Sequence, residues 1–168
     1  MKKNYAKVLN GFFAGLIAIT VNTLLLKAAP IFNIEAESGG LLKLILLHTY
    51  VYMNTPMLAF AHTAAFALLF HYLTGFAMVV LYVYILEPLL PGKGWQKGSL
   101  FSLLPWILNG FIILPLLGQG FIGIRQLPVT GIIYFFMANW IFGMILGKLY
   151  EIFQKKRKLK TINMKKYY

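Results

Sequence analysis

Histidines and acids are the residue types here that could carry chemistry. The chain contains three histidines, four acidic residues and no cysteine, so thiolate catalysis, thiolate metal sites and disulfides are excluded. Every acid falls at the end of an apolar run or outside one: Glu35, Glu37, Glu87 and Glu151. We therefore expect no paired carboxylates within a bilayer and no acid–base catalysis by such a pair, and interpret the protein as a non-enzyme.

The histidine spacing argues against a metal or cofactor site. His62 and His71 are nine positions apart in one predicted helix, which places them on opposite faces and about 13 Å apart in height. His48 could approach His62 through a bend at Pro56, but two histidines without a third ligand make a weak metal site. We expect no cofactor.

His71 keeps three interpretations open because intramembrane ionisable residues are candidates for function. The first is a neutral imidazole that is hydrogen-bonded to a polar side chain across the bundle. The second is a group that handles protons or substrate, and the third is a haem or metal ligand.

The elements that must position these residues are apolar helices. Of 168 residues, 60% are hydrophobic and only 12% are charged, against roughly a quarter charged in globular proteins. Apolar runs long enough to span a bilayer cover about residues 8–26, 57–86, 99–117 and 128–149. This pattern predicts an all-α integral membrane protein, with a four-helix bundle over residues 1–149 and a basic tail over 150–168.

The predicted helices carry local signals for packing and bending. Gly11 and Gly15, like Gly143 and Gly147, are spaced four apart, which lets another helix approach closely. The run 57–86 is longer than the hydrocarbon core, so a single helix there must tilt or protrude. Pro105 and Pro115 predict kinks in the third span.

The apolar run at residues 41–53 is too short to cross a bilayer. Lys43 and His48 interrupt it, and Tyr50 and Tyr52 suit the depth of lipid headgroups. We interpret it as an additional amphipathic helix that lies at the external membrane interface.

Basic residues predict the orientation. With four spans, thirteen of the 16 Lys and Arg residues share one side with both termini, and only Lys27, Lys43 and Arg125 lie opposite. The positive-inside rule then places both termini in the cytoplasm. A basic run beside a membrane is best explained by anionic lipid headgroups, and no nucleic-acid partner is expected. The lipid contacts would be Lys155, Lys156, Arg157, Lys158 and Lys160.

Polar side chains at matching depth define a candidate intramembrane site. Counted from the cytoplasmic ends of the spans, Asn109 and Asn139 both lie at about 15 Å, whereas Asn22 and His71 both reach about 21 to 22 Å. Polar groups in hydrocarbon are costly unless they are hydrogen-bonded, so we predict two layers, Asn109 with Asn139 and Asn22 with His71. Thr74 is a possible further partner.

Short motifs also resemble a known family. They include the histidine, aromatic residue and glycine in 71–75, the Leu-Leu-Pro-Gly at 89–92, Lys97-Gly98, the run 114–123 and the glycine-rich segment 11–16. Over residues 8 to 149 the chain resembles the YagU-type proteins, small four-helix bacterial inner-membrane proteins grouped in a family of unknown function. The resemblance implies a fold and a location in the bacterial inner membrane, without an activity, and it does not extend to 33–56 or to the tail.

Three classes of function remain open from the sequence. The favoured one is a non-enzymatic accessory, assembly or scaffolding component, acting with itself as a homo-oligomer or with another membrane protein. The spans carry small-residue packing faces and few interior polar groups, which supports this class. The alternative is a small transporter or channel that works as an oligomer, since one unit with so little interior polarity can hardly line a water path. An enzyme or a haem- or metal-binding protein that uses His71 has the least support.

Overall fold

The computed structural model describes residues 2–36, 39–49 and 55–166, with side chains described for 5–157 and 159 within those ranges. No described residue lies in a strand. Four helical segments are long and apolar enough to cross a membrane: Tyr5–Phe32, Ala64–Leu89, Gly94–Leu116 and Val129–Arg157. The predicted all-α fold with four span-length apolar helices is confirmed.

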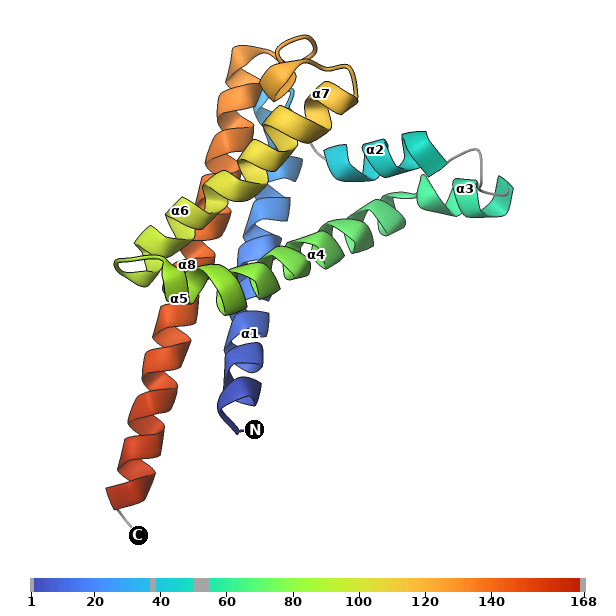
Figure 1. The fold of residues 1–168 in the computed structure, drawn as a ribbon. Helices are drawn as coiled ribbons and strands as arrows, with labels where there is room; N and C mark the ends of the chain where they lie inside the picture. Colours follow the sequence, from blue (N-terminus) through green and yellow to red (C-terminus); the bar gives the residue numbers. More distant parts are fainter. Residues whose placement is uncertain (1, 37–38, 50–54, 167–168) are drawn as a thin grey trace.

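Along the chain, the helical elements are α1 (Lys2–Ala28), η1 (Ala29–Phe32), α2 (Gly40–Thr49), α3 (Thr55–Ala61), α4 (Ala64–Leu81), η3 (Tyr82–Leu86), α5 (Glu87–Leu89), α6 (Gly94–Ile107), η4 (Leu108–Ile113), α7 (Leu114–Leu116), η5 (Phe121–Gly123) and α8 (Val129–Lys166). The long helices α1 and α8 run antiparallel, α8 also packs against α6, and α1 packs against α4 (Figure 1). The N-terminal part of α4 extends away from the α1–α8 pair, on the side where α2 and α3 lie (Figure 1).

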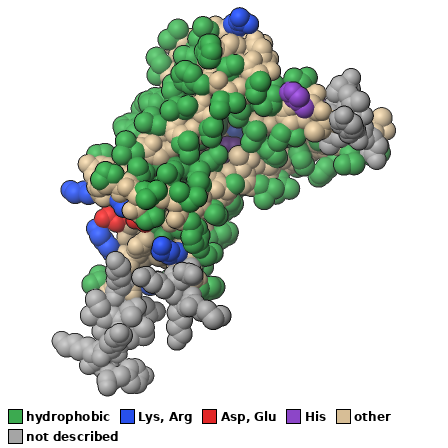
Figure 2. Space-filling model, viewed as in Figure 1, with side chains coloured by type: hydrophobic (Ala, Val, Ile, Leu, Met, Phe, Trp, Pro, Cys, Tyr) green, Lys and Arg blue, Asp and Glu red, His purple; other side chains and the backbone are tan. Residues whose placement is uncertain are grey.

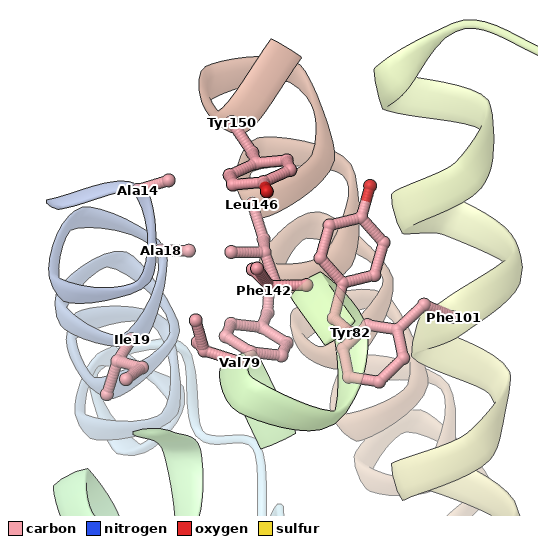
Figure 3. Close-up of a cluster of buried hydrophobic side chains, with 10 residues drawn as sticks. Ala14, Ala18, Ile19, Val79, Tyr82, Phe101, Phe142, Leu146 and Tyr150 are labelled. Atoms are coloured by element: carbon pink, nitrogen blue, oxygen red, sulfur yellow. The ribbon is translucent and has the colours of Figure 1, made fainter. Parts of the chain in front are cut away.

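The core lies where α1, α4, η3, α6 and α8 meet (Figure 3). Ala14 and Ala18 are fully buried and bring α1 against this cluster. On the other side, the rings of Tyr82 and Phe101 lie 5.1 Å apart between centroids, and those of Tyr82 and Tyr150 lie 6.1 Å apart. Aromatic contacts of this kind fix the relative rotation of helices because the rings prefer a few offset or edge-to-face arrangements.

Glycines set the closest helix contact, between α6 and α8. Gly94 and Gly98 of α6 face Gly147 and Gly143 of α8, and a Cβ on any of the four would collide with the backbone of the opposite helix. Without side chains between them, the two backbones touch directly, which maximises dispersion contact where no hydrophobic effect drives association. The Gly143–Gly147 spacing in the sequence thus marks a contact within the chain.

The second predicted span is wrong as a single helix. The chain breaks at His62–Thr63, between α3 and α4. The Thr63 hydroxyl donates to the Phe60 carbonyl at 2.7 Å and accepts from the Phe66 amide at 3.2 Å. Thr63 therefore ends one helix and caps the next, which explains the break inside an apolar run.

The third helix begins earlier than predicted, and its irregular segment lies between Pro105 and Pro115. It starts at Gly94, where Glu151 of α8 accepts from the Gly94 amide at 2.9 Å, and it continues through Pro105. The irregularity is the π-helical η4, in which the Leu114 amide reaches the Asn109 carbonyl. This π-helical segment ends two residues before Pro115, and the π-helical η3 ends two residues before Pro88. A π-turn absorbs the loss of a helical hydrogen bond at each of these prolines.

The fourth helix does not end at 149. α8 continues to Lys166, so the residues predicted as a tail extend the span as a helix. Lys155 pairs with Glu151 at 2.6 Å, one turn apart on this extension. Figure 2 shows charged side chains gathered near the α5–α6 turn and the adjoining part of α8, with a broad apolar surface beyond them.

The short apolar helix after α1 spans Gly40–Thr49, and Tyr50 and Tyr52 lie outside the described residues. Its position at a membrane interface stays a prediction. Its N-terminal residues are packed inward, since Gly40 and Leu42 are buried.

Candidate functional site: an intramembrane cavity

A cavity of about 400 Å³ lies between α1, α4, η4 and α8, with the start of α2 at its side. It lies within the size range of small-molecule sites, roughly 300–1,000 Å³. Its walls are mainly apolar, and all five residues of the predicted polar site line it: Asn22, His71, Thr74, Asn109 and Asn139. We call this space the inner cavity.

The helices place these side chains from four directions. Asn22 comes from α1, His71 and Thr74 from successive positions on α4, Asn109 from η4 and Asn139 from α8. Asn109 lies near the start of the π-helical η4, and its carbonyl accepts from the Leu114 amide. The structure thus brings together residues that are far apart in the sequence.

The predicted pairing within this group is wrong. Asn22 donates across the bundle to the Ala138 carbonyl at 3.0 Å, and Asn139 donates to the Phe135 carbonyl of its own helix at 2.8 Å. The side-chain amides of Asn22 and Asn139 thus donate to backbone carbonyls and not to the predicted side-chain partners. A helical carbonyl oxygen can accept this second bond because it has two lone pairs.

Thr74, His71 and Asn109 complete the polar lining. The Thr74 hydroxyl donates to the Phe70 carbonyl at 2.8 Å, which satisfies it within α4. Among the residues that the structure describes, His71 and Asn109 have no hydrogen-bond partner. These two side chains therefore keep their full hydrogen-bonding capacity for a bound molecule, while Asn22 and Asn139 each keep an amide oxygen that accepts no hydrogen bond from a described residue.

Asn109 also fixes the position of α2. A Cβ built at Gly40 would lie 2.8 Å from the Asn109 side-chain oxygen and 3.3 Å from Ile113. A side chain at this position would displace the Asn109 side chain, so Gly40 lets the start of α2 lie close to η4 at one side of the inner cavity. The Gly39-Gly40 pair is a turn signal in the sequence, but no sequence pattern predicts this close approach.

A second, larger cavity adjoins the first. It measures about 920 Å³ and lies between the end of α1, α2, α3 and α4, and we call it the outer cavity. The two share lining residues, namely Leu26, Gly39, Leu42, Ala67 and His71. His71 therefore stands at the junction, with its ring 6.3 Å from that of Tyr72.

The outer cavity contains the basic residues that the sequence left unassigned. Lys27 of α1, Lys43 of α2 and His62 line it, and none of its described lining residues is acidic. The sequence marked Lys27 and Lys43 only as exceptions to the charge asymmetry. Their convergence needed the fold, because they belong to different helices.

The described residues contain no group of three or more His, Cys, Asp or Glu side chains that could hold a metal ion. The chemistry available at the inner cavity is hydrogen bonding from an imidazole and an amide against apolar walls. This lining is suited in shape and polarity to a largely apolar molecule with one polar group.

The predicted lipid-contact residues lie on the extension of α8, remote from both cavities in sequence. Lys155 and Lys156 are exposed and Arg157 is half-buried. The side chains of Lys158 and Lys160 lie outside the described part of the chain, so their contacts stay a prediction.

Fold and cavity together define the class, an all-α protein with four apolar helices of membrane-spanning length around a mainly apolar cavity. The chain belongs to a family of unknown function (DUF6789), which matches residues 5–161. No curated protein and no solved structure matches the chain. Nothing in these comparisons ties it to YagU-type proteins or to a bacterial inner membrane.

Proposed function

We propose that the protein is a non-enzymatic, accessory membrane protein that binds a lipid-like molecule in its inner cavity. The observation that carries the proposal is the lining of this cavity, which is apolar apart from five convergent polar side chains. Two of these, His71 and Asn109, have no hydrogen-bond partner among the described residues. A polar group of the ligand would bond to them while its apolar part contacts Ile19, Met78 and Phe142.

The same lining argues against the other candidate functions. An ion or water path needs rings of carbonyls or charged side chains, whereas phenylalanine, leucine, isoleucine and methionine side chains dominate this cavity. A haem site in the inner cavity would have His71 as the one histidine among its described lining residues, and no further observation favours it. We therefore place binding ahead of transport and of redox chemistry.

An accessory role agrees with the surface of α4. Leu69 and Leu73 are 53% and 60% exposed, so the N-terminal part of this helix presents apolar side chains to lipid, to a second copy or to another membrane protein. We place both termini in the cytoplasm, on the charge asymmetry described above. The assignment to the bacterial inner membrane rests on the resemblance to YagU-type proteins alone. The basic end of α8 would then contact anionic headgroups, with no nucleic-acid partner.

Photochemical labelling tests the binding proposal. The purified protein in phosphatidylcholine nanodiscs is exposed to a photoreactive hexadecanol, and the labelled residues are mapped by mass spectrometry. We expect labels on α1, α4 and α8 residues that line the inner cavity. Labels spread evenly over the lipid-facing side chains would contradict the proposal.

A matched pair of variants sharpens this test. Ala67 lines both cavities, whereas Ala77 is an exposed residue of the same helix that lines neither. Ala67→Trp should fill the junction and abolish labelling of the inner cavity, and Ala77→Trp should leave it unchanged. Equal labelling in both variants would count against a defined binding site.

A further inference from the structure

We infer that the ligand of the inner cavity is an amphiphile whose polar group is uncharged and donates a hydrogen bond, namely a hydroxyl or an amide N–H. This inference rests on the proposed function, because it names the chemical class that the cavity would take. Two observations carry it: the orientation of two asparagine side chains, and a described lining without lysine, arginine or acidic residues.

The side-chain amides of Asn22 and Asn139 are oriented by their own hydrogen bonds. Asn22 donates to the Ala138 carbonyl at 3.0 Å. Asn139 donates to the Phe135 carbonyl at 2.8 Å. Because a backbone carbonyl can only accept a hydrogen bond, the nitrogen of each side-chain amide must face it. The side-chain oxygen is therefore turned away from that carbonyl, and neither oxygen accepts a bond from a described residue.

These two side-chain oxygens require a donor on the ligand. Asn22 and Asn139 both line the inner cavity, and an apolar molecule that fills it removes water from them. A desolvated acceptor without a donor costs free energy, so the ligand must replace the hydrogen bond from water. An ether or a ketone can only accept and leaves both oxygens unpaired. A hydroxyl or an amide N–H satisfies one of them.

His71 and Asn109 supply the complementary donors. Neither has a hydrogen-bond partner among the described residues, and both line the same cavity. The amide nitrogen of Asn109 and a ring N–H of His71 can each donate to an oxygen of the ligand. The lining thus offers acceptors and donors together. A hydroxyl or an amide group matches it, because each of these groups both donates and accepts.

The described lining also disfavours an ionised ligand group. It contains no aspartate, glutamate, lysine or arginine, and His71 is its one ionisable side chain. A charged group that leaves water for this cavity loses its hydration without gaining a permanent counter-charge, which is strongly unfavourable. A neutral polar group loses less hydration and regains it as hydrogen bonds. The cavity therefore selects an uncharged amphiphile.

Three photoreactive probes of equal chain length test the inference: hexadecanol, hexadecyl methyl ether and hexadecyl sulfate. The ether keeps the oxygen of the alcohol but cannot donate, and the sulfate is charged at any pH used. Each probe is titrated onto the wild-type protein in phosphatidylcholine nanodiscs, and labels on the inner cavity are quantified by mass spectrometry. We expect hexadecanol to label it about threefold to tenfold more strongly than the ether, the factor that one net hydrogen bond contributes. The sulfate should label it more weakly than either neutral probe.

Variants identify the acceptor. Asn22→Leu and Asn139→Leu each remove one of the two oxygens, and at least one of them should bring hexadecanol and ether labelling towards equality. Thr130→Val is the matched control, because Thr130 is an exposed polar residue of α8 that lines neither cavity. It should keep the wild-type preference for the alcohol. A preference that survives both asparagine variants contradicts these acceptors.

The wild-type comparison needs no variant, so the inference stays testable even if Asn22→Leu destabilises the bundle. Equal labelling by hexadecanol and the ether overturns the requirement for a donor. A sulfate that labels the cavity as strongly as hexadecanol overturns the requirement for a neutral group. Failure of hexadecanol to label the wild-type inner cavity at all overturns the proposed function itself, so the failures are distinguishable.

Competition distinguishes the two polar groups that fit. Unlabelled monopalmitoylglycerol, which donates from hydroxyls, and unlabelled palmitamide, which donates from an amide N–H, are each added against photoreactive hexadecanol. Stronger displacement by monopalmitoylglycerol assigns the site to a hydroxyl-bearing lipid, and stronger displacement by palmitamide assigns it to a fatty amide. Displacement by neither contradicts the inference.

Discussion

Replacing Gly98 by alanine should weaken the bundle through a single added methyl group. A Cβ at this position falls on the carbonyl of Gly143 and lies 3.0 Å from the Gly147 amide nitrogen. These atoms belong to the backbone of α8, so the side chains cannot relieve the collision and the helices must separate. Overpacking of this kind costs about 1–3 kcal/mol, and occasionally more.

Gly11→Ala is the matched control on another helix contact. Its Cβ would lie 3.0 Å from one methyl group of Val83, which is the end of a side chain and can move by a few tenths of an ångström. Both substitutions gain the same helix propensity, about 1 kcal/mol. The difference between them therefore isolates the backbone collision, and we expect Gly98→Ala to be the less stable by about 1–3 kcal/mol.

Reversible unfolding in mixed micelles, with increasing fractions of a denaturing detergent, measures the free energy of unfolding of each variant. The helical circular dichroism of the folded state checks that both variants fold before denaturation. If Gly98→Ala and Gly11→Ala lower the free energy of unfolding equally, the direct backbone contact between α6 and α8 does not exist as described.

Three further substitutions test other contacts. Asn22→Leu removes the bond to the Ala138 carbonyl and should lower the free energy of unfolding by about 0.6–2 kcal/mol, measured in the same titration. Asn22→Asp cannot donate this bond as a carboxylate, so its free energy of unfolding should be lowered at least as much. Thr63→Ala removes the cap of α4 and should cost about 0.5–2 kcal/mol, with faster amide exchange at Phe66, the residue that Thr63 caps; unchanged exchange there would contradict the cap. Lys97→Met removes the 3.2 Å ion pair with Glu87, in which the Lys97 side chain is 17% exposed and the Glu87 side chain 23%. A double-mutant cycle with Glu87→Gln should give a coupling energy that favours the folded state. A coupling energy of zero would show that the pair does not stabilise the protein.

The break between α3 and α4 shows why local composition was insufficient to predict where the helices of the second span begin and end. Residues 57–86 are continuously apolar, and apolarity alone predicts one helix. Thr63 is a weak signal in such a run, because a threonine inside a membrane helix usually bonds to its own preceding turn. Here the Thr63 hydroxyl bonds to the Phe60 carbonyl and also accepts from the Phe66 amide, and a periodicity count does not predict this second bond.

In the polar site, too, residue counting predicted some features and only the fold decided others. Counting residues from the membrane boundary gave the depth of Asn22, His71, Asn109 and Asn139, since the rise per residue of a helix is fixed. Depth does not give the direction in which a side chain faces. The π-turn in η4 and the crossing of α1 over α8 decided that Asn22 meets the Ala138 carbonyl and that Asn109 meets α2.

The sequence by itself determined the class of protein, the number of long apolar helices and the small-residue spacings, because these follow from hydrophobicity, length and side-chain size within single segments. Only the tertiary structure decided which glycines touch, where α2 lies, and that Lys27 and Lys43 converge on one cavity. The physical reason is that helix rotation and crossing are set by contacts between segments distant in the chain, and no local pattern records them.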